Sequence, residues 1–144
     1  MEFKLIELTD KNNILKTYEI YKHCMFMPSE EKINKKTDQF LKDNSVKIFA
    51  CFNQNEMVGV IVFSFVGQRK IQIIGISVHP SFRNNDIGSY MIDKVINDYS
   101  LLSVYAETDN DAVGFYKKYG FNITKVFETH YGKTIVRYKC EFKK

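Results

Sequence analysis

A polar loop between two apolar segments has residue types that could bind an anion. An apolar run ends at Val78, a loop of small and polar residues follows at 80–86, and a helical pattern then starts with Gly88 and Ser89 in its first turn. The first backbone N–H groups of a helix have no partner within the helix, and the helix dipole adds partial positive charge. This arrangement suits a pyrophosphate, and Arg83 can add a charge-assisted hydrogen bond.

Gly75 interrupts the apolar run just before this loop. A glycine inside a strand indicates a β-bulge or a close backbone approach. Either would leave the peptide groups of Ile76, Ser77 and Val78 free to pair with something other than a neighbouring strand. An extended ligand that carries amides could occupy that edge, in the manner of strand addition. A glycine needed only for packing is the alternative.

Two hydrophobic periods alternate along the chain and predict the elements that position these residues. Apolar, β-branched and aromatic runs with short polar connections predict strands, three of them in an antiparallel meander. Apolar residues on one helical face predict helices, and Asp10 and Ser29 can cap the first two. The expected strands are residues 3–8, 46–52, 57–65, 71–78, 101–107, 123–130 and 134–142, and the expected helices are residues 14–27, 30–41, 87–98 and 111–119.

The segment 71–107 is expected to form a strand, a helix and a second strand, which places the two strands parallel. The expected fold class is therefore α/β, with a central mixed, mostly antiparallel sheet, one parallel βαβ unit and flanking helices. Ligands in such sheets bind near the carboxyl ends of strands. The chain has 144 residues without linker or repeat, which predicts a single domain over residues 1–144.

The composition of the chain limits the classes of partner that it is expected to bind. The chain has 21 Lys and Arg against 17 Asp and Glu, and its basic residues are mostly interleaved with acidic ones. This permits a phosphate-bearing ligand but lacks the basic stripe of a nucleic-acid-binding domain. The three cysteines are far apart and show no zinc-ligand spacing, so free thiols and no metal are expected. Without a signal peptide or a membrane-spanning run, we expect a cytoplasmic soluble protein with no membrane partner.

Two motifs in a fixed order resemble the GNAT superfamily of acetyl-CoA-dependent N-acetyltransferases. The first is Val78-x-Pro80-x-x-Arg83-x-x-x-Ile87-Gly88, and the second is Asn110-x-Ala112-x-x-Phe115-Tyr116-x-x-x-Gly120-Phe121. The expected strands and helices match the layout of that superfamily over essentially the whole chain. The resemblance therefore implies the GNAT fold, acetyl-CoA as cosubstrate and transfer of an acetyl group to an amine.

The resemblance also implies roles for individual residues. The backbone near Gly75 would pair with the pantetheine arm, the loop would wrap the pyrophosphate, and Tyr116 would face the sulfur as general acid. The implied cofactor-binding residues are Ile76, Ser77, Val78, Arg83, Asn84, Asn85, Asp86, Ile87, Gly88, Ser89, Asn110 and Tyr116. The family commonly has glycine at the position of Asp86, so we expect Asp86 to adopt a left-handed conformation and to turn outward.

Several assignments stay open at this point. Tyr116 could instead be a core aromatic of a short helix. Glu107, at the end of a strand, is the best-placed candidate for a catalytic base, and a water relay is the alternative. The acceptor groove implied by the resemblance has an aromatic and methionine-rich lining, which suggests few fixed charges. Its implied lining residues are Tyr18, Tyr21, His23, Met25, Phe26, Met27, His130 and Tyr131.

The resulting expectation is an acyltransferase that moves acetyl from acetyl-CoA to a primary amine by direct attack, through a tetrahedral intermediate, with Tyr116 as general acid. The acceptor would be a small-molecule amine or a peptide amine, and a homodimer is a candidate assembly. A non-catalytic acyl-CoA-binding regulatory module is the alternative, and a nucleic-acid-binding domain is the weaker rival.

Overall fold

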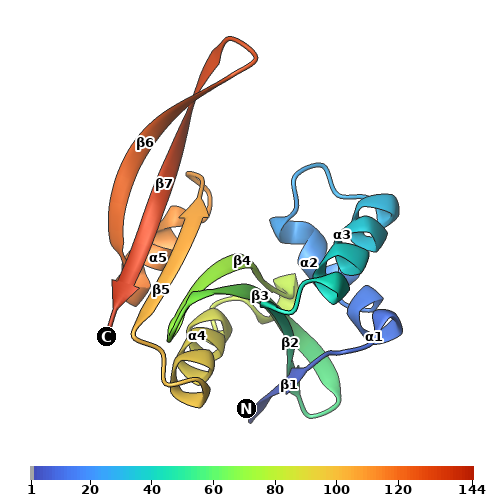
Figure 1. Cartoon of the computed structure of the whole chain (residues 1–144). Helices are drawn as coiled ribbons and strands as arrows, with labels where there is room; N and C mark the ends of the chain where they lie inside the picture. The colour runs from blue at the N-terminus through green and yellow to red at the C-terminus, as the bar shows by residue number, and fades with distance from the viewer. Residues whose placement is uncertain (1) are drawn as a thin grey trace.

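One mixed sheet organises the protein, whose computed structural model describes residues 2–144. In that part of the chain its strand order is β1-β2-β3-β4-β5-β7-β6 (Figure 1). The strands are β1 (Phe3–Glu7), β2 (Val46–Asn53), β3 (Glu56–Gly67), β4 (Lys70–Val78), β5 (Ser103–Thr108), β6 (Asn122–His130) and β7 (Lys133–Lys143). The β4–β5 pair is parallel and the other pairs are antiparallel. This confirms the expected α/β class with one βαβ unit.

The helices cover both faces of the first part of the sheet, except the last helix, which packs against β6 and β7. They are α1 (Lys11–Leu15), α2 (Tyr18–Tyr21), the 3-10 turn η1 (Lys22–Cys24), α3 (Glu30–Lys42), the 3-10 turn η2 (Pro80–Phe82), α4 (Ile87–Asp98) and α5 (Val113–Tyr119). Ser29 caps α3 by accepting the backbone N–H of Lys32, as predicted. No helix within residues 2–144 has the length and apolar character to cross a bilayer.

The predicted helix over 14–27 is wrong, because that segment forms α1, α2 and η1 instead. Asp10 accepts the N–H of Asn13 at 2.9 Å, so the first helix begins at Lys11. The hydroxyl of Thr17 then donates to the carbonyl of Ile14 at 2.6 Å. A Thr side chain that bonds nearby backbone competes with regular helix geometry, which fits the break between α1 and α2.

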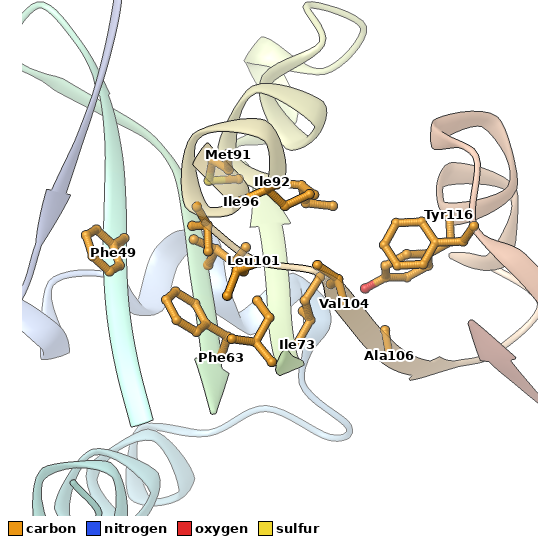
Figure 2. Packing of buried hydrophobic residues seen from close by; sticks show 14 of the residues in the cluster. Phe49, Phe63, Ile73, Met91, Ile92, Ile96, Leu101, Val104, Ala106 and Tyr116 are labelled. Carbon is orange, nitrogen blue, oxygen red and sulfur yellow. The ribbon is translucent and has the colours of Figure 1, made fainter. Parts of the chain in front are cut away.

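The core has two layers, one on each side of the sheet. On the α4 side, Phe49, Phe63 and Val104 pack with residues of α4 such as Met91 and Ile92 (Figure 2). On the other side, a second cluster joins α1, α2 and α3 to β2 and β3. The sheet between these layers is therefore fixed by apolar packing on both faces.

β4 contains the bulge that Gly75 predicts. Val62 pairs with Gly75 and Phe63 pairs with Ile73, so Ile74 is an extra residue in β4. The extra residue changes the alternation of the strand, so that both Ile73 and Ile76 contact the core on the α4 side. Gly75 correspondingly faces the other layer, where a Cβ atom would meet the side chain of Tyr21.

The two parallel strands separate beyond this bulge. β4 pairs with β5 from Lys70 to Ile73, and its remaining residues pair only with β3. The N–H of His79 bonds the carbonyl of Val58 on β3 at 2.8 Å. Since peptide groups alternate along a strand, the N–H groups of Ile76 and Val78 point away from β3, into the opening. Figure 1 shows β4 and β5 diverging there.

Candidate active site

The start of α4 lies beside this opening and has no side-chain cap. Asp86 at its N-cap has φ 58° and ψ 25°, the left-handed conformation expected of it, and Asn84 has φ 68°. The amide of Asn85 donates to the carbonyls of Phe82 (2.9 Å) and Arg83 (3.2 Å), which stabilises the turn. The first N–H groups of α4 are thus left for an anion.

The predicted loop residues differ in burial in a way that fits this arrangement. The loop side chains are exposed, whereas the first two residues of α4 are buried and the third is half-buried. The exposed residues are Arg83, Asn84, Asn85 and Asp86, and the helix residues are Ile87, Gly88 and Ser89. Asp86 makes no capping hydrogen bond. Its carboxylate therefore does not compete with a ligand for the helix N–H groups.

Contacts between α4 and α5 join the two sides of the opening. A Cβ atom on Gly88 would lie 2.8 Å from the Phe115 ring, so only glycine allows this approach. The hydroxyl of Tyr119 also donates to the carboxylate of Asp93. These contacts connect the helix that follows β4 to the helix that follows β5, so the width of the opening is defined by packing.

Of the three predicted edge residues, Ile76 and Val78 face the opening with their N–H groups. The same alternation turns the N–H of Ser77 toward β3. The buried Ser77 hydroxyl donates to the carbonyl of Ile20 at 2.7 Å, which connects β4 to α2. Ser77 is thus placed to fix the position of α2 with its side chain, a role that the sequence did not indicate.

Tyr116 combines the two interpretations that the sequence left open. Its ring packs with Phe115 and Phe121 at centroid distances of 5.2 and 5.1 Å, and 5% of the residue is exposed. Figure 2 shows the hydroxyl directed from α5 toward β5. Burial raises the pKa of Tyr116, so the phenol keeps its proton at neutral pH.

The hydroxyl of Tyr116 has no hydrogen-bond partner among residues 2–144. No fully enclosed side-chain nitrogen or oxygen in that range lacks a partner. The hydroxyl therefore keeps contact with open space. A protonated phenol of this kind can donate to a ligand placed between β4 and β5.

The residues at the end of β5 are exposed and point in different directions. The amide oxygen of Asn110 accepts the Tyr138 hydroxyl at 2.6 Å, and Glu107 accepts the Tyr105 hydroxyl at 2.9 Å. Asp109, which we did not single out, accepts the N–H groups of Asp111 (3.0 Å) and Ala112 (3.3 Å) just before α5. The preference of Asp for positions before a helix was the available signal.

Glu107 lies on the sheet face opposite to the core. Its β5 neighbours Ala106 and Thr108 are buried, and Glu107 is directly opposite Lys139 of β7. Because successive side chains alternate, Glu107 points to the face that α1, α2 and α3 cover elsewhere in the sheet. The structure therefore separates Glu107 from the ring of Tyr116.

The wall formed by β6 and β7 differs from the expected lining with few fixed charges. Glu128 lies 3.0 Å from His130 and directly opposite Ile135. The hydrogen bond from His130 lowers the pKa of Glu128, and the charges of Arg137 and Lys139 act in the same direction. Tyr131 is fully exposed at the turn. Among residues 2–144, no three metal-ligating side chains gather as a site.

A comparison with protein families matches residues 14–121 to the acetyltransferase (GNAT) family. A search of curated proteins gives no match. Among solved structures, a GNAT-family acetyltransferase from Elizabethkingia anophelis with acetyl-CoA bound is 21% identical, with TM-score 0.70 and coverage of 98% of this chain and 97% of the other.

Two further structures share the fold at lower identity. The ribosomal-protein-S18-alanine N-acetyltransferase from Escherichia coli is 14% identical, with TM-score 0.73 and coverage of 99% and 94%. A spermidine N-acetyltransferase chimera that includes the Vibrio cholerae enzyme is 14% identical, with TM-score 0.76 and coverage of 99% and 96%. At such identities these likenesses establish the shared fold.

Proposed function

The chain belongs to the acetyltransferase (GNAT) family, and we propose that it transfers the acetyl group of acetyl-CoA to a primary amine by direct attack, with Tyr116 as general acid. Acyl transfer from acetyl-CoA is the activity of this family. The observation that carries the proposal is the opening beyond the β4 bulge. An unpaired strand edge, the uncapped start of α4 and a protonated phenol all border it.

Each border of the opening fits a part of acetyl-CoA. The edge N–H groups of Ile76 and Val78 would bond the amides of the pantetheine arm. The N–H groups at the start of α4 would bind the pyrophosphate, with Arg83 adding charge. The proposed donor site comprises Ile76, Val78, Arg83, Asn84, Asn85, Asp86, Ile87, Gly88, Ser89, Asn110 and Tyr116. Ser77, whose N–H points to β3, supports this site only through its side-chain bond to Ile20.

The proposed reaction needs one proton donor and one oxyanion site. The amine lone pair forms a bond to the thioester carbon while the carbonyl π electrons move to oxygen. The carbonyl re-forms as the C–S bond breaks, and Tyr116 gives its proton to the leaving sulfur. The amine proton leaves to water or, through water, to Glu107. Solvent then restores the proton of Tyr116.

The acceptor is proposed only as a class, an amine of a small molecule or of a peptide. The neighbours named above act on spermidine and on a ribosomal protein alanine. The charged wall of β6 and β7, which contains Glu128, His130 and Arg137, is a candidate for recognising the acceptor amine. It faces the same side of the sheet as Glu107. We further propose that residues 1–144 form one domain and that a homodimer is an assembly to test.

An acetyl-CoA-dependent thiol-release screen over amines and peptides tests the activity. Wild type should release CoA with at least one acceptor, and Tyr116→Phe should lower kcat by about 10²-fold or more. Full activity of Tyr116→Phe across the pH range would contradict the acid role. Acetyl-CoA binding without thiol release against any amine would instead favour the non-catalytic acyl-CoA-binding module.

A further inference from the structure

Tyr21 at the end of α2 lies against the β4 bulge. A Cβ atom on Gly75 would be 2.3 Å from the Tyr21 hydroxyl oxygen and 2.8 Å from the ring. Only glycine at position 75 therefore lets the phenol come this close to the strand backbone. Tyr21 is 3% exposed, and it is separated from the bulge by more than fifty positions in the chain.

The Tyr21 hydroxyl has no hydrogen-bond partner among residues 2–144. Since no wholly enclosed side-chain oxygen in this range lacks a partner, the hydroxyl borders open space. The Ser77 to Ile20 hydrogen bond of 2.7 Å holds the preceding residue of α2 on the same strand. A buried, unpartnered donor is thus held in place beside the opening.

Other groups border the same opening from different elements. The N–H of Ile76 points into it, adjacent in the chain to Gly75. The Cys24 thiol donates to the carbonyl of Tyr21 at 3.2 Å on the same side. The phenols of Tyr21 and Tyr116 are near enough for the charge of one to raise the pKa of the other. α2, β4 and α5 thus each contribute one hydrogen-bond donor.

We propose that the hydroxyl of Tyr21 is a second hydrogen-bond donor to the acetyl carbonyl oxygen, beside the N–H of Ile76. This inference rests on the proposed function and adds a catalytic residue to it. When the amine attacks, the carbonyl electron pair moves to that oxygen, and Tyr21 stabilises the charge without giving up its proton. When the C–S bond breaks, the pair returns to the carbonyl and Tyr116 protonates the sulfur.

The two tyrosines therefore have separate tasks. Burial raises the pKa of Tyr21, so the phenol remains a neutral donor at the pH at which an amine acceptor is unprotonated. A backbone N–H and a phenol on the same oxygen form an oxyanion site that is set before the substrate arrives. Such donors matter most when charge develops in the transition state.

The test compares Tyr21→Phe with wild type by kinetics and by binding. Loss of one oxyanion donor should lower kcat by about 10²-fold while KM for acetyl-CoA changes little. In calorimetry, the preference of the protein for acetyl-CoA over CoA should also decrease, because CoA has no acetyl carbonyl to accept the hydrogen bond of Tyr21. Tyr99→Phe, a hydroxyl deletion in the aromatic cluster of Phe63 and Phe65, is the matched control and should change neither quantity.

A Tyr21→Phe kcat within about twofold of wild type would overturn the inference. A lower kcat with an unchanged preference for acetyl-CoA would overturn it too, because the hydroxyl would then act elsewhere than on the carbonyl. If wild type turns over no amine, the proposed function fails, and the binding preference alone decides the role of Tyr21. Thermal melts of both variants check that folding is retained.

Discussion

The sheet has two halves that differ in how they are covered. In β2, β3 and residues 75–78 of β4 both faces are packed, so that Val60 and Ile61 are fully buried although they point to opposite faces. In β5, β7 and β6 only one face meets the core, and β6 is exposed along most of its length. Figure 1 shows α5 beside one end of the β6–β7 hairpin and the other end extending beyond the helices.

This difference determines how freely the backbone and the surface side chains of each half can change. The edge of β4 that we propose to bind the donor belongs to the part of the sheet that is packed on both faces, where a shift of the backbone would disturb two apolar layers. The open face of β5, β7 and β6 is not restricted in this way, and charged residues occupy it. Donor geometry and acceptor choice are therefore expected to depend on different halves.

Removing a phenylalanine from each half should give the largest contrast. Phe63→Ala, at a side chain that is 0% exposed, should lower the free energy of unfolding by about 3–5 kcal/mol. Phe127→Ala, at a side chain that is 67% exposed on β6, should change it by less than about 0.5 kcal/mol. Urea unfolding measures both, and similar losses would break the comparison.

Stability above pH 10 should report on the buried phenols. Burial raises the pKa values of Tyr21 and Tyr116 in the folded state. Above about pH 10 the unfolded chain loses these protons while the folded chain retains them. The stability that these two phenols contribute is therefore fully present below that pH, and it should decrease by about 1.4 kcal/mol per pH unit for each phenol above it.

Urea unfolding between pH 8 and about 11 measures this dependence. Tyr116→Phe should reduce the slope of the unfolding free energy against pH by the contribution of one phenol. Tyr131→Phe, at the exposed turn, should leave the slope as in wild type. Equal slopes in the three proteins would contradict the burial of the Tyr116 phenol.

Two hydroxyl deletions compare single hydrogen bonds in the two halves. Ser77→Ala removes a buried 2.7 Å bond and leaves the Ile20 carbonyl without it, which should cost about 1–2 kcal/mol. Tyr138→Phe removes an exposed 2.6 Å bond to Asn110 and should cost less than about 0.5 kcal/mol. Thermal melts compare the two variants, and a larger loss in Tyr138→Phe would reverse the order of the halves.

Asp86→Gly should have the smallest effect on stability and a specific effect on binding. Glycine adopts the left-handed conformation more easily than Asp, and it removes a carboxylate near the proposed pyrophosphate site. Acetyl-CoA should therefore bind a few-fold more tightly in calorimetry. Gln54→Gly, at φ 56° in the exposed β2–β3 turn, gives the same backbone relief without a change in binding. Equal or weaker binding by Asp86→Gly would count against this account.

The sequence predicted what depends on local pattern. The meander, the helix of α4 and the bulge at Gly75 follow from hydrophobic period and from one glycine. The break at Thr17 was missed because the apolar pattern continues through it, although the Thr17 hydroxyl bonds the Ile14 carbonyl there. The Tyr116 hydroxyl could be nominated, but its burial depends on packing with Phe115 and Phe121.

Contacts between distant segments were not predictable from pattern. The bond between Ser77 and Ile20 joins residues 57 positions apart, and Tyr21, the next residue of α2, approaches Gly75 across a similar separation. The charged wall was also missed, because the register of β6 and β7 decides that Glu128 and Arg137 share a face.

The central claim is that the opening between β4 and β5 binds acetyl-CoA. An NMR titration of the full chain with acetyl-CoA tests it by following the backbone amides of both halves. The account predicts that the shifts concentrate at Ile76, Val78 and the residues that start α4, and that amides of the outer part of the β6–β7 hairpin change little. Shifts concentrated on that hairpin, with Ile76 and Val78 unchanged, would contradict it.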